Sequence, residues 1–379
     1  MDLSSSGTRW GDRRRMRWFF LVRGMHMDVP LLAGLIILSA IGLITLYSAS
    51  GRELVYVEKQ GLRLALGFTA MFVMAQVPPH QLQRWAPWLF SAGLVLLLAV
   101  LGLGEIGKGA QRWLDLGIVR FQPSELMKLA VPAMVAWYLS EKMLPPKLKG
   151  AVIAAALTLV PTVLIAKQPD LGTSLLVMTS GLFVILLAGI PWRWVASVIA
   201  LTVPVAWLMW VYGMHDYQRN RVLTFLNPQS DPLGTGYHII QSEIAIGSGG
   251  AYGKGWLNGT QAHLEFLPES STDFIFAVYA EEFGLIGSIL LLCVYLFLIA
   301  RGLYIASQAQ STFTRLLAAS VTLTFFVYVF VNIGMVSGLL PVVGVPLPLI
   351  SFGGTSLVTV MTGFGILMSI QTHRKLLPT

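Results

Sequence analysis

The sequence predicts an all-α, polytopic membrane protein of about ten transmembrane helices. Of its 379 residues, 55% are hydrophobic and only 12% are charged, whereas a typical soluble chain is about 25% charged. Runs of about 20 apolar residues, the length that crosses a bilayer, recur along the chain. This composition excludes a disordered protein and a soluble enzyme. The one cysteine, Cys293, excludes a disulfide framework and a Cys-based zinc site.

Candidate spans follow one another along the chain, and most are bounded by Pro, Gly or charged residues. Between the seventh and eighth lies an extracytoplasmic loop of residues 213–272, far longer than an ordinary connection and therefore expected to carry function. The predicted organisation is a basic tail of residues 1–28, one membrane domain of 29–371 and a second tail of 372–379. The spans are predicted at 29–48, 62–77, 86–103, 122–140, 150–166, 171–189, 192–212, 273–300, 313–339 and 352–371.

The distribution of charge predicts the orientation. Most of the 26 lysines and arginines lie in the N-terminal tail and in alternate loops, so both termini are expected to be cytoplasmic. Most of the 18 acids lie in the opposite loops or within spans, and the net charge of +8 therefore describes topology and not a nucleic-acid partner. Ser48-Ala49-Ser50 after the first apolar run resembles a signal-peptide cleavage site, but the run is long for such a peptide and further spans follow.

Ionisable residues near the start of the fourth span form the first candidate site. Pro123 suits the first helical position, which makes Gln122 the N-cap and places Glu125 where the helix dipole favours an acid. Lys128 lies one turn further on the same face. A buried lysine needs an anion, which is either Glu125 or a ligand phosphate.

Two further clusters contain acids at predicted helix starts. Asp170, after Lys167, suits the cap of the sixth span, and Thr272 or Asp273 suits the cap of the eighth. Glu281 and Glu282 lie about two turns into the eighth span, where a cap cannot explain them. They need Lys128, Arg63, water or a ligand, and pairing with cations to hold the bundle together is the favoured interpretation.

The outer loops add cations, amides and irregular segments. Arg112-Trp113 precedes the fourth span, and Arg219, Arg221 and Gln241 lie in the long loop. The glycine run from Gly247 to Gly255 lacks the spacing of a nucleotide-binding loop, so we interpret it as a flexible or tight connection. The prolines between 338 and 356 cannot continue a helix. That segment is predicted to be partly re-entrant, with its Ser/Thr/Gly end facing a cavity.

These blocks, in this order, resemble the SEDS family (shape, elongation, division and sporulation). The resemblance covers about residues 29–375. Its most specific pieces are Lys108 to Asp115, Phe121 to Glu125, Gln168 to Thr173, Gly234 to Ser242, Phe266 to Glu269 with Thr272 to Phe276, and Gly338 to Ser356.

The resemblance implies a peptidoglycan glycosyltransferase of the elongation machinery, located in the cytoplasmic membrane. Its substrate would be lipid II, and its partner a class B penicillin-binding protein, PBP2. Asp273 would be the general base that deprotonates the acceptor hydroxyl, and cations would neutralise the pyrophosphate leaving group. The residues assigned to substrate are Arg112, Trp113, Gln122, Lys128, Arg219, Arg221, Gln241, Ser351 and Thr355, and the supporting polar residues are Glu125, Lys167, Asp170, Glu269, Glu281 and Glu282.

The residues leave several points open. A divalent cation, Mg²⁺ or Mn²⁺, could join the cations on the pyrophosphate, held by Asp273 or Glu269, although no ligand spacing demands one. The family usually has a histidine where this chain has Ser271, which affects how Asp273 is tuned. A lipid II flippase and a non-catalytic scaffold for the penicillin-binding protein are the competing functions.

Overall fold

The computed structural model describes residues 26–103, 105–107, 110–115, 120–213, 219, 223, 235–260 and 269–374. A helix of at least 17 residues overlaps each of the ten predicted spans. The helices are α2 (Val29–Ala49), α3 (Leu54–Gln76), α4 (Pro79–Leu103), α5 (Pro123–Ser140), α6 (Leu148–Lys167), α7 (Leu171–Leu187), α8 (Trp192–Leu208), α12 (Ile275–Ser307), α13 (Thr312–Val336) and α14 (Thr355–Thr372).

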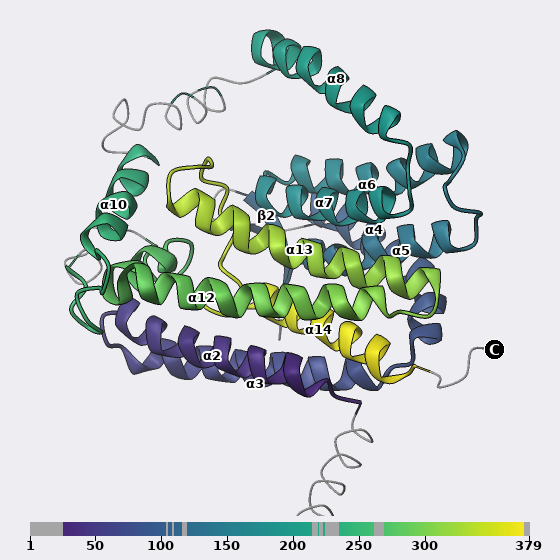
Figure 1. The fold of residues 1–379 in the computed structure, drawn as a ribbon. Helices are drawn as coiled ribbons and strands as arrows, with labels where there is room; N and C mark the ends of the chain where they lie inside the picture. Colours follow the sequence, from purple (N-terminus) through teal and green to yellow (C-terminus); the bar gives the residue numbers. More distant parts are fainter. Residues whose placement is uncertain are drawn as a thin grey trace, which may run out of the picture.

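Six of the described helices are long and apolar enough to cross a membrane: α2, α4, α6, α12, α13 and α14. The described α7 is apolar but slightly shorter. The prediction of a helical, multi-pass membrane protein is therefore confirmed. A short π-helix, η1 (Met209–Gly213), continues α8, and both run along the top of Figure 1.

The helices of the bundle lie side by side with their axes roughly aligned (Figure 1). Helix α13 packs against α5, α7 and α12, while α14 packs mainly against α3 and α12 packs against α2. The amphipathic helix α10 (Thr235–Ser248) lies across one end, against α12 and α13. We call this the α10 end, and the opposite end, where the described chain begins and finishes, the terminal end.

The α10 end also contains structure that is not helical. Three short antiparallel strands, β1 (Glu105–Gly107), β2 (Ala110–Asp115) and β3 (Arg120–Phe121), lie in sheet order β1-β2-β3 between α4 and α5. The sequence analysis did not anticipate this small sheet. The segment 337–354, between α13 and α14, is irregular, as its prolines predict.

Helix α12 is broken near the α10 end. Gly284 has φ 65° and ψ −162°, a conformation that is essentially restricted to glycine. The turn of residues 249–255 fills the break, since the amides of Lys254 and Gly255 donate to the carbonyls of Glu281 and Glu282. This turn, with Gly250, Gly253 and Gly255 at positive φ, confirms that the glycine run is a tight connection. We call this arrangement the α12 break.

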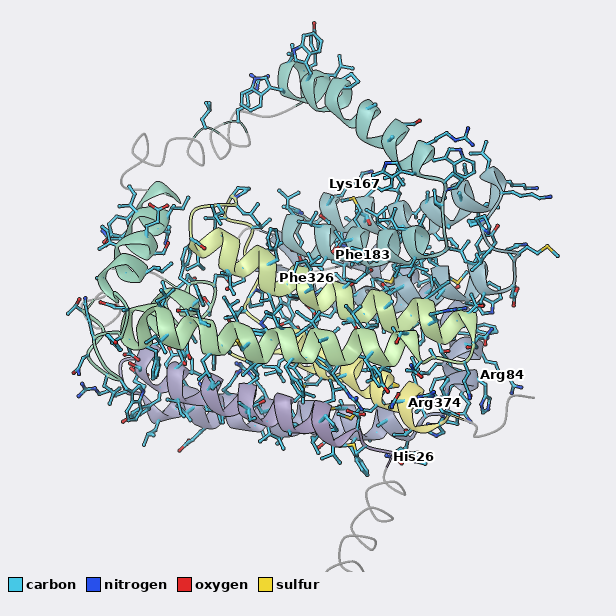
Figure 2. The ribbon with its side chains drawn as sticks, in the orientation of Figure 1. His26, Arg84, Lys167, Phe183, Phe326 and Arg374 are labelled. Carbon is cyan, nitrogen blue, oxygen red and sulfur yellow. The ribbon has the colours of Figure 1, made fainter. Side chains whose placement is uncertain are left out.

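The terminal end is tied together by a different set of contacts. Asp28 caps α2 through the Leu31 amide and forms a bidentate ion pair with Arg301, at 3.1 and 2.6 Å. The rings of His26 and His373 lie 4.1 Å apart. His26, Arg84 and Arg374 lie at this same end in Figure 2. The first and last described segments therefore meet there.

The ring contact between His26 and His373 is expected to weaken as pH falls. Burial, and then the charge of His373, lower the pKa of His26 from its ordinary value of 6.5. The contact therefore contributes stability above that value and loses it as pH falls through the lower, folded-state pKa. We expect the melting temperature to fall from about pH 7.5 to about pH 5.5.

The matched control for this pH effect is His26→Phe, which keeps a ring but cannot ionise. The difference in melting temperature between the unsubstituted chain and this variant should shrink or reverse as pH falls. An identical pH dependence in both proteins would show that the titration of His26 does not affect stability.

Candidate active site

A polar cavity of about 210 Å³ opens at the α10 end of the bundle. Its walls come from the starts of α5, α7 and α14, from α13 and from the irregular segment 337–354. Six residues expected from the sequence to bind substrate or to support that site line it together. They are Trp113, Gln122, Glu125, Lys128, Asp170 and Thr355.

The buried ion pair of α5 forms the floor of the cavity. Lys128 Nζ lies 2.7 Å from Glu125 Oε1, and each residue is only 5% exposed. The ammonium group also lies 5.2 Å from the centre of the Tyr328 ring, on α13. The expected pairing of Lys128 with Glu125 is confirmed, and it places a buried ion pair in the lining of the cavity.

A second buried link joins the starts of α5 and α7. Asp170 caps α7 through the Thr173 amide, at 3.3 Å, as predicted. Its other carboxylate oxygen accepts a hydrogen bond from the Gln122 amide, at 2.9 Å. Gln122 occupies the N-cap of α5 without a side-chain capping bond, so its side chain connects the two helices instead.

The Asp273 carboxylate lies beside Gly344, which lines this cavity, and Asp273 is not the N-cap of α12. The helix starts at Ile275 and its N-cap is Phe274, whose side chain makes no capping bond, so the prediction that Thr272 or Asp273 is the N-cap of this helix is wrong. The reason is that 269–274 forms its own turn, in which the Thr272 and Phe274 amides donate to the Glu269 carbonyl. A Cβ on Gly344 would lie 3.5 Å from Asp273 Oδ2, which places that carboxylate beside the cavity wall.

Buried side chains bind the backbone of the irregular segment 337–354. The Gln60 amide donates to the Ser351 carbonyl, at 3.1 Å, and the Tyr295 hydroxyl donates to the Pro348 carbonyl, at 2.8 Å. The Ser351 hydroxyl accepts from the Leu347 amide and donates to the Thr272 carbonyl, at 2.8 and 2.6 Å. The hydroxyl of Ser351, expected to face substrate, is therefore engaged within the protein.

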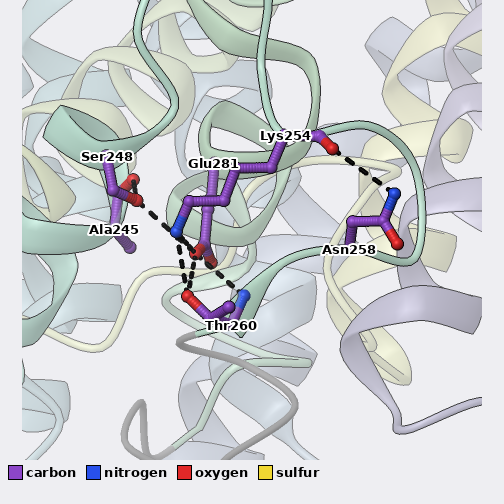
Figure 3. Close-up of polar contacts among 6 residues, drawn as sticks. All are labelled: Ala245, Ser248, Lys254, Asn258, Thr260 and Glu281. Carbon is purple, nitrogen blue, oxygen red and sulfur yellow. Dashed lines mark hydrogen bonds and ion pairs between the residues drawn. The ribbon is translucent and has the colours of Figure 1, made fainter.

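Glu281 and Glu282 are partnered at the α12 break, away from the polar cavity. Glu281 Oε1 lies 2.6 Å from Lys254 Nζ and accepts from the Thr260 amide and hydroxyl, at 2.9 and 3.0 Å (Figure 3). Glu282 accepts from the Ser48 hydroxyl and from the Leu257 amide. The expectation that cation pairing holds these acids is confirmed for Glu281.

The expected cations, however, are not the ones that the structure uses at the α12 break. Lys128 pairs with Glu125, and the Arg63 guanidinium lies 4.1 Å from the centre of the Phe352 ring. The partner of Glu281 is Lys254, because the turn of the α12 break returns the long loop to the helix.

The remaining predicted residues are more dispersed. Arg219 donates to the carbonyls of Trp210 and Val211 in η1, at 3.1 and 3.0 Å. Arg221 lies outside the described residues, and for Arg112 only the backbone, in β2, is described. The described residues Lys167, Gln241 and Glu269 are not among those lining the cavity.

Several cavity residues were missed by sequence reasoning. Tyr328, Thr173 and Ser356 line the cavity beside the predicted set. Tyr328 is a polar residue inside α13, a helix otherwise apolar enough to cross a membrane, and polar residues at such positions often have a function. The described residues contain no group of three or more His, Cys, Asp or Glu side chains that could hold a metal ion.

This fold and site define a class, a multi-pass membrane protein with a buried lysine in its polar cavity and an aspartate beside the cavity wall. The chain belongs to the FtsW/RodA/SpoVE family of cell cycle proteins, whose model matches residues 24–376.

Named relatives cover nearly the whole chain. The peptidoglycan glycosyltransferase MrdB of Escherichia coli K12 is 56% identical over 353 residues, which cover 93% of this chain and 95% of that protein. MrdB of Helicobacter pylori J99 is 38% identical over 92% of this chain and 91% of its own length.

Two solved structures share the fold. One, described as a peptidoglycan synthase complex that coordinates polymerization and crosslinking, has a TM-score of 0.81 and 33% identity, covering 92% of this chain and 98% of that one. The rod shape determining protein RodA of Thermus thermophilus has a TM-score of 0.69 and 28% identity, covering 92% and 98%.

Removing the cation at the α12 break should destabilise the protein. Lys254→Met leaves the fully buried Glu281 without its ion pair, which should lower the free energy of unfolding by about 3 kcal/mol. The melting temperature in detergent measures this effect. Lys59→Met, at an exposed lysine of α3, is the matched control and should melt like the unsubstituted chain. Equal melting of both variants would contradict the assigned pairing.

The ion pair on the cavity floor can be tested by removing its charges in turn. Lys128→Met alone should lower the free energy of unfolding by about 3 kcal/mol, because Glu125 remains as an uncompensated buried charge. Adding Glu125→Gln removes that charge and should restore most of the loss. Melting curves of the single and double variants decide this, and a double variant as unstable as the single one would show that the charge is not the cause.

Proposed function

We propose that this chain is a peptidoglycan glycosyltransferase that polymerises lipid II into glycan strands during cell elongation. The observation that carries the proposal is that the Asp273 carboxylate lies beside Gly344, in the wall of a polar cavity that Lys128 also lines. Membership of the family, and 56% identity to a protein named for this activity, support it.

The reaction needs a base, and Asp273 is the candidate. An acceptor sugar hydroxyl attacks the anomeric carbon of the donor, its proton passes to the base, and the lipid pyrophosphate leaves. A carboxylate beside the cavity wall at Gly344 would receive that proton from a sugar held at the membrane surface.

The leaving group needs positive charge, and Lys128 supplies it inside the cavity. Glu125 orients the ammonium group, and an ammonium near the pyrophosphate stabilises the charge that develops as the bond breaks. Trp113 and Thr355 line the same cavity and offer an aromatic face and a hydroxyl to the sugars. A Mg²⁺ or Mn²⁺ ion carried on the pyrophosphate would add to this charge, with Asp273 or Glu269 as protein ligand.

The same proposal assigns orientation and partner. The terminal end holds Arg84, Arg301 and Arg374, which supports cytoplasmic termini in the cytoplasmic (inner) membrane. The α10 end would then face the compartment where the cell wall is built. A class B penicillin-binding protein, PBP2, is the proposed partner, supported by the likeness to a synthase complex that couples polymerization to crosslinking.

The decisive experiment uses the purified chain with its penicillin-binding protein, lipid II as substrate and crosslinking blocked. Asp273→Asn keeps the size of the side chain and removes the proton acceptor, so glycan polymer should form at least about 100-fold more slowly. Gel analysis of labelled polymer measures the rate.

Three outcomes separate the alternatives. No polymer from the unsubstituted chain, together with lipid II translocation in proteoliposomes, would establish a flippase and overturn the proposal. No polymer and no translocation would leave a scaffold. Unchanged polymer from Asp273→Asn would overturn only the assignment of the base.

A further inference from the structure

Asn332 is a fully buried amide in the interior of α13, with no role in the reaction described above. It is 0% exposed, and it lies within a helix that is otherwise apolar enough to cross a membrane. An amide in such a helix is costly unless its hydrogen-bonding groups are satisfied. Its partners therefore indicate why the position is polar.

Both donors of the Asn332 amide bind backbone carbonyls of the candidate active site. Its Nδ2 donates to the Asp273 carbonyl at 2.9 Å and to the Val345 carbonyl at 2.8 Å. Because both partners are acceptors, only the nitrogen of the amide can face them, which fixes the orientation of the side chain. One side chain thus joins the turn of residues 269–274 to the cavity wall around Gly344 and Val345.

A second buried side chain holds the neighbouring peptide group. The Ser351 hydroxyl donates to the Thr272 carbonyl at 2.6 Å. The carbonyls of Thr272 and Asp273 flank the Cα of Asp273, so binding both restricts the two backbone dihedrals of this residue. The two hydrogen bonds, from Asn332 and from Ser351, therefore fix the direction of the Cα–Cβ bond of Asp273, from which its carboxylate extends.

We propose that Asn332 is a positioning residue for Asp273. Its two hydrogen bonds hold the backbone of Asp273 at a fixed distance from the cavity wall at Val345, and this fixes where the Asp273 carboxylate lies. This inference rests on the proposed function, in which Asp273 is the base. Asn332 touches neither substrate nor the reacting atoms. Its effect is on the rate of the chemical step, because a displacement of about 1 Å in a catalytic group can cost about 100-fold.

The test compares Asn332→Leu with Ser320→Ala. Leucine has a similar size and suits an apolar helix, but it donates no hydrogen bond. Ser320 lies on the same helix and donates to the Ser180 carbonyl of α7, at 2.6 Å, so its variant also removes one buried hydrogen bond of α13 to a backbone carbonyl, away from the polar cavity. We expect Asn332→Leu to lower kcat about 10- to 100-fold with KM for lipid II changed less than about twofold, and Ser320→Ala to change neither.

Amide hydrogen exchange supplies a readout that does not depend on activity. Asn332→Leu should speed exchange at residues 271–274 and 344–347 without speeding it in the rest of α13, and Ser320→Ala should leave both segments unchanged. Unaltered exchange in Asn332→Leu overturns the proposal, as does a kcat within about twofold of the unsubstituted chain.

A merely structural role gives a different pattern. It would lower the melting temperature of both variants while the folded fraction kept its full kcat, and that result also overturns the proposal. If the unsubstituted chain forms no polymer, the proposed function fails. In that case the rate of amide hydrogen exchange at residues 271–274 and 344–347, compared between the unsubstituted chain and Asn332→Leu, still decides whether Asn332 holds the two segments together.

Discussion

The constraint on which this structure depends is that an irregular backbone deep in a membrane protein must have its polar groups bound by the protein itself. The segment 337–354 supplies a cavity wall precisely because it is not helical, and it therefore leaves carbonyls and amides that no helix satisfies. Gln60, Tyr295 and Ser351, each almost fully buried, bind them. Two of these side chains come from helices, Gln60 from α3 and Tyr295 from α12, and the third comes from the segment itself.

The two ion pairs of the α10 end serve different purposes within this arrangement. Lys128 and Glu125 lie on one helix and face the cavity, where their charge is available to a ligand. Lys254 and Glu281 lie far apart in the sequence, and their contact closes the long loop onto α12. The first pair is suited to chemistry, and the second to holding the loop in place.

Local signals in the sequence predicted the spans, the Lys128–Glu125 pair and the cap formed by Asp170, since each depends on residues within one helical turn or one apolar run. Contacts between distant segments could not be predicted in this way. The partner of Glu281 was expected among residues within the spans, but it is Lys254, in a turn of the long loop. The N-cap expected at Asp273 is absent because residues 269–274 form a separate turn before the helix. Asn332, an amide in an apolar run, was a visible signal that a search for charged residues alone passed over.

The break at Gly284 divides α12 into a short outer piece, which follows directly from Asp273, and a long inner piece that makes up most of the span. A continuous helix behaves as a stiff rod and passes the tilt of one end to the other. Here the turn of residues 249–255 is bonded to both pieces: its amides donate to the carbonyls of Glu281 and Glu282, and its carbonyls accept from the amides of Leu285 and Ile286. The bend in α12 is therefore held by a separate stretch of chain bonded to both of its sides, so the angle at which the helix approaches the aspartate depends on the long loop as well as on the helix itself.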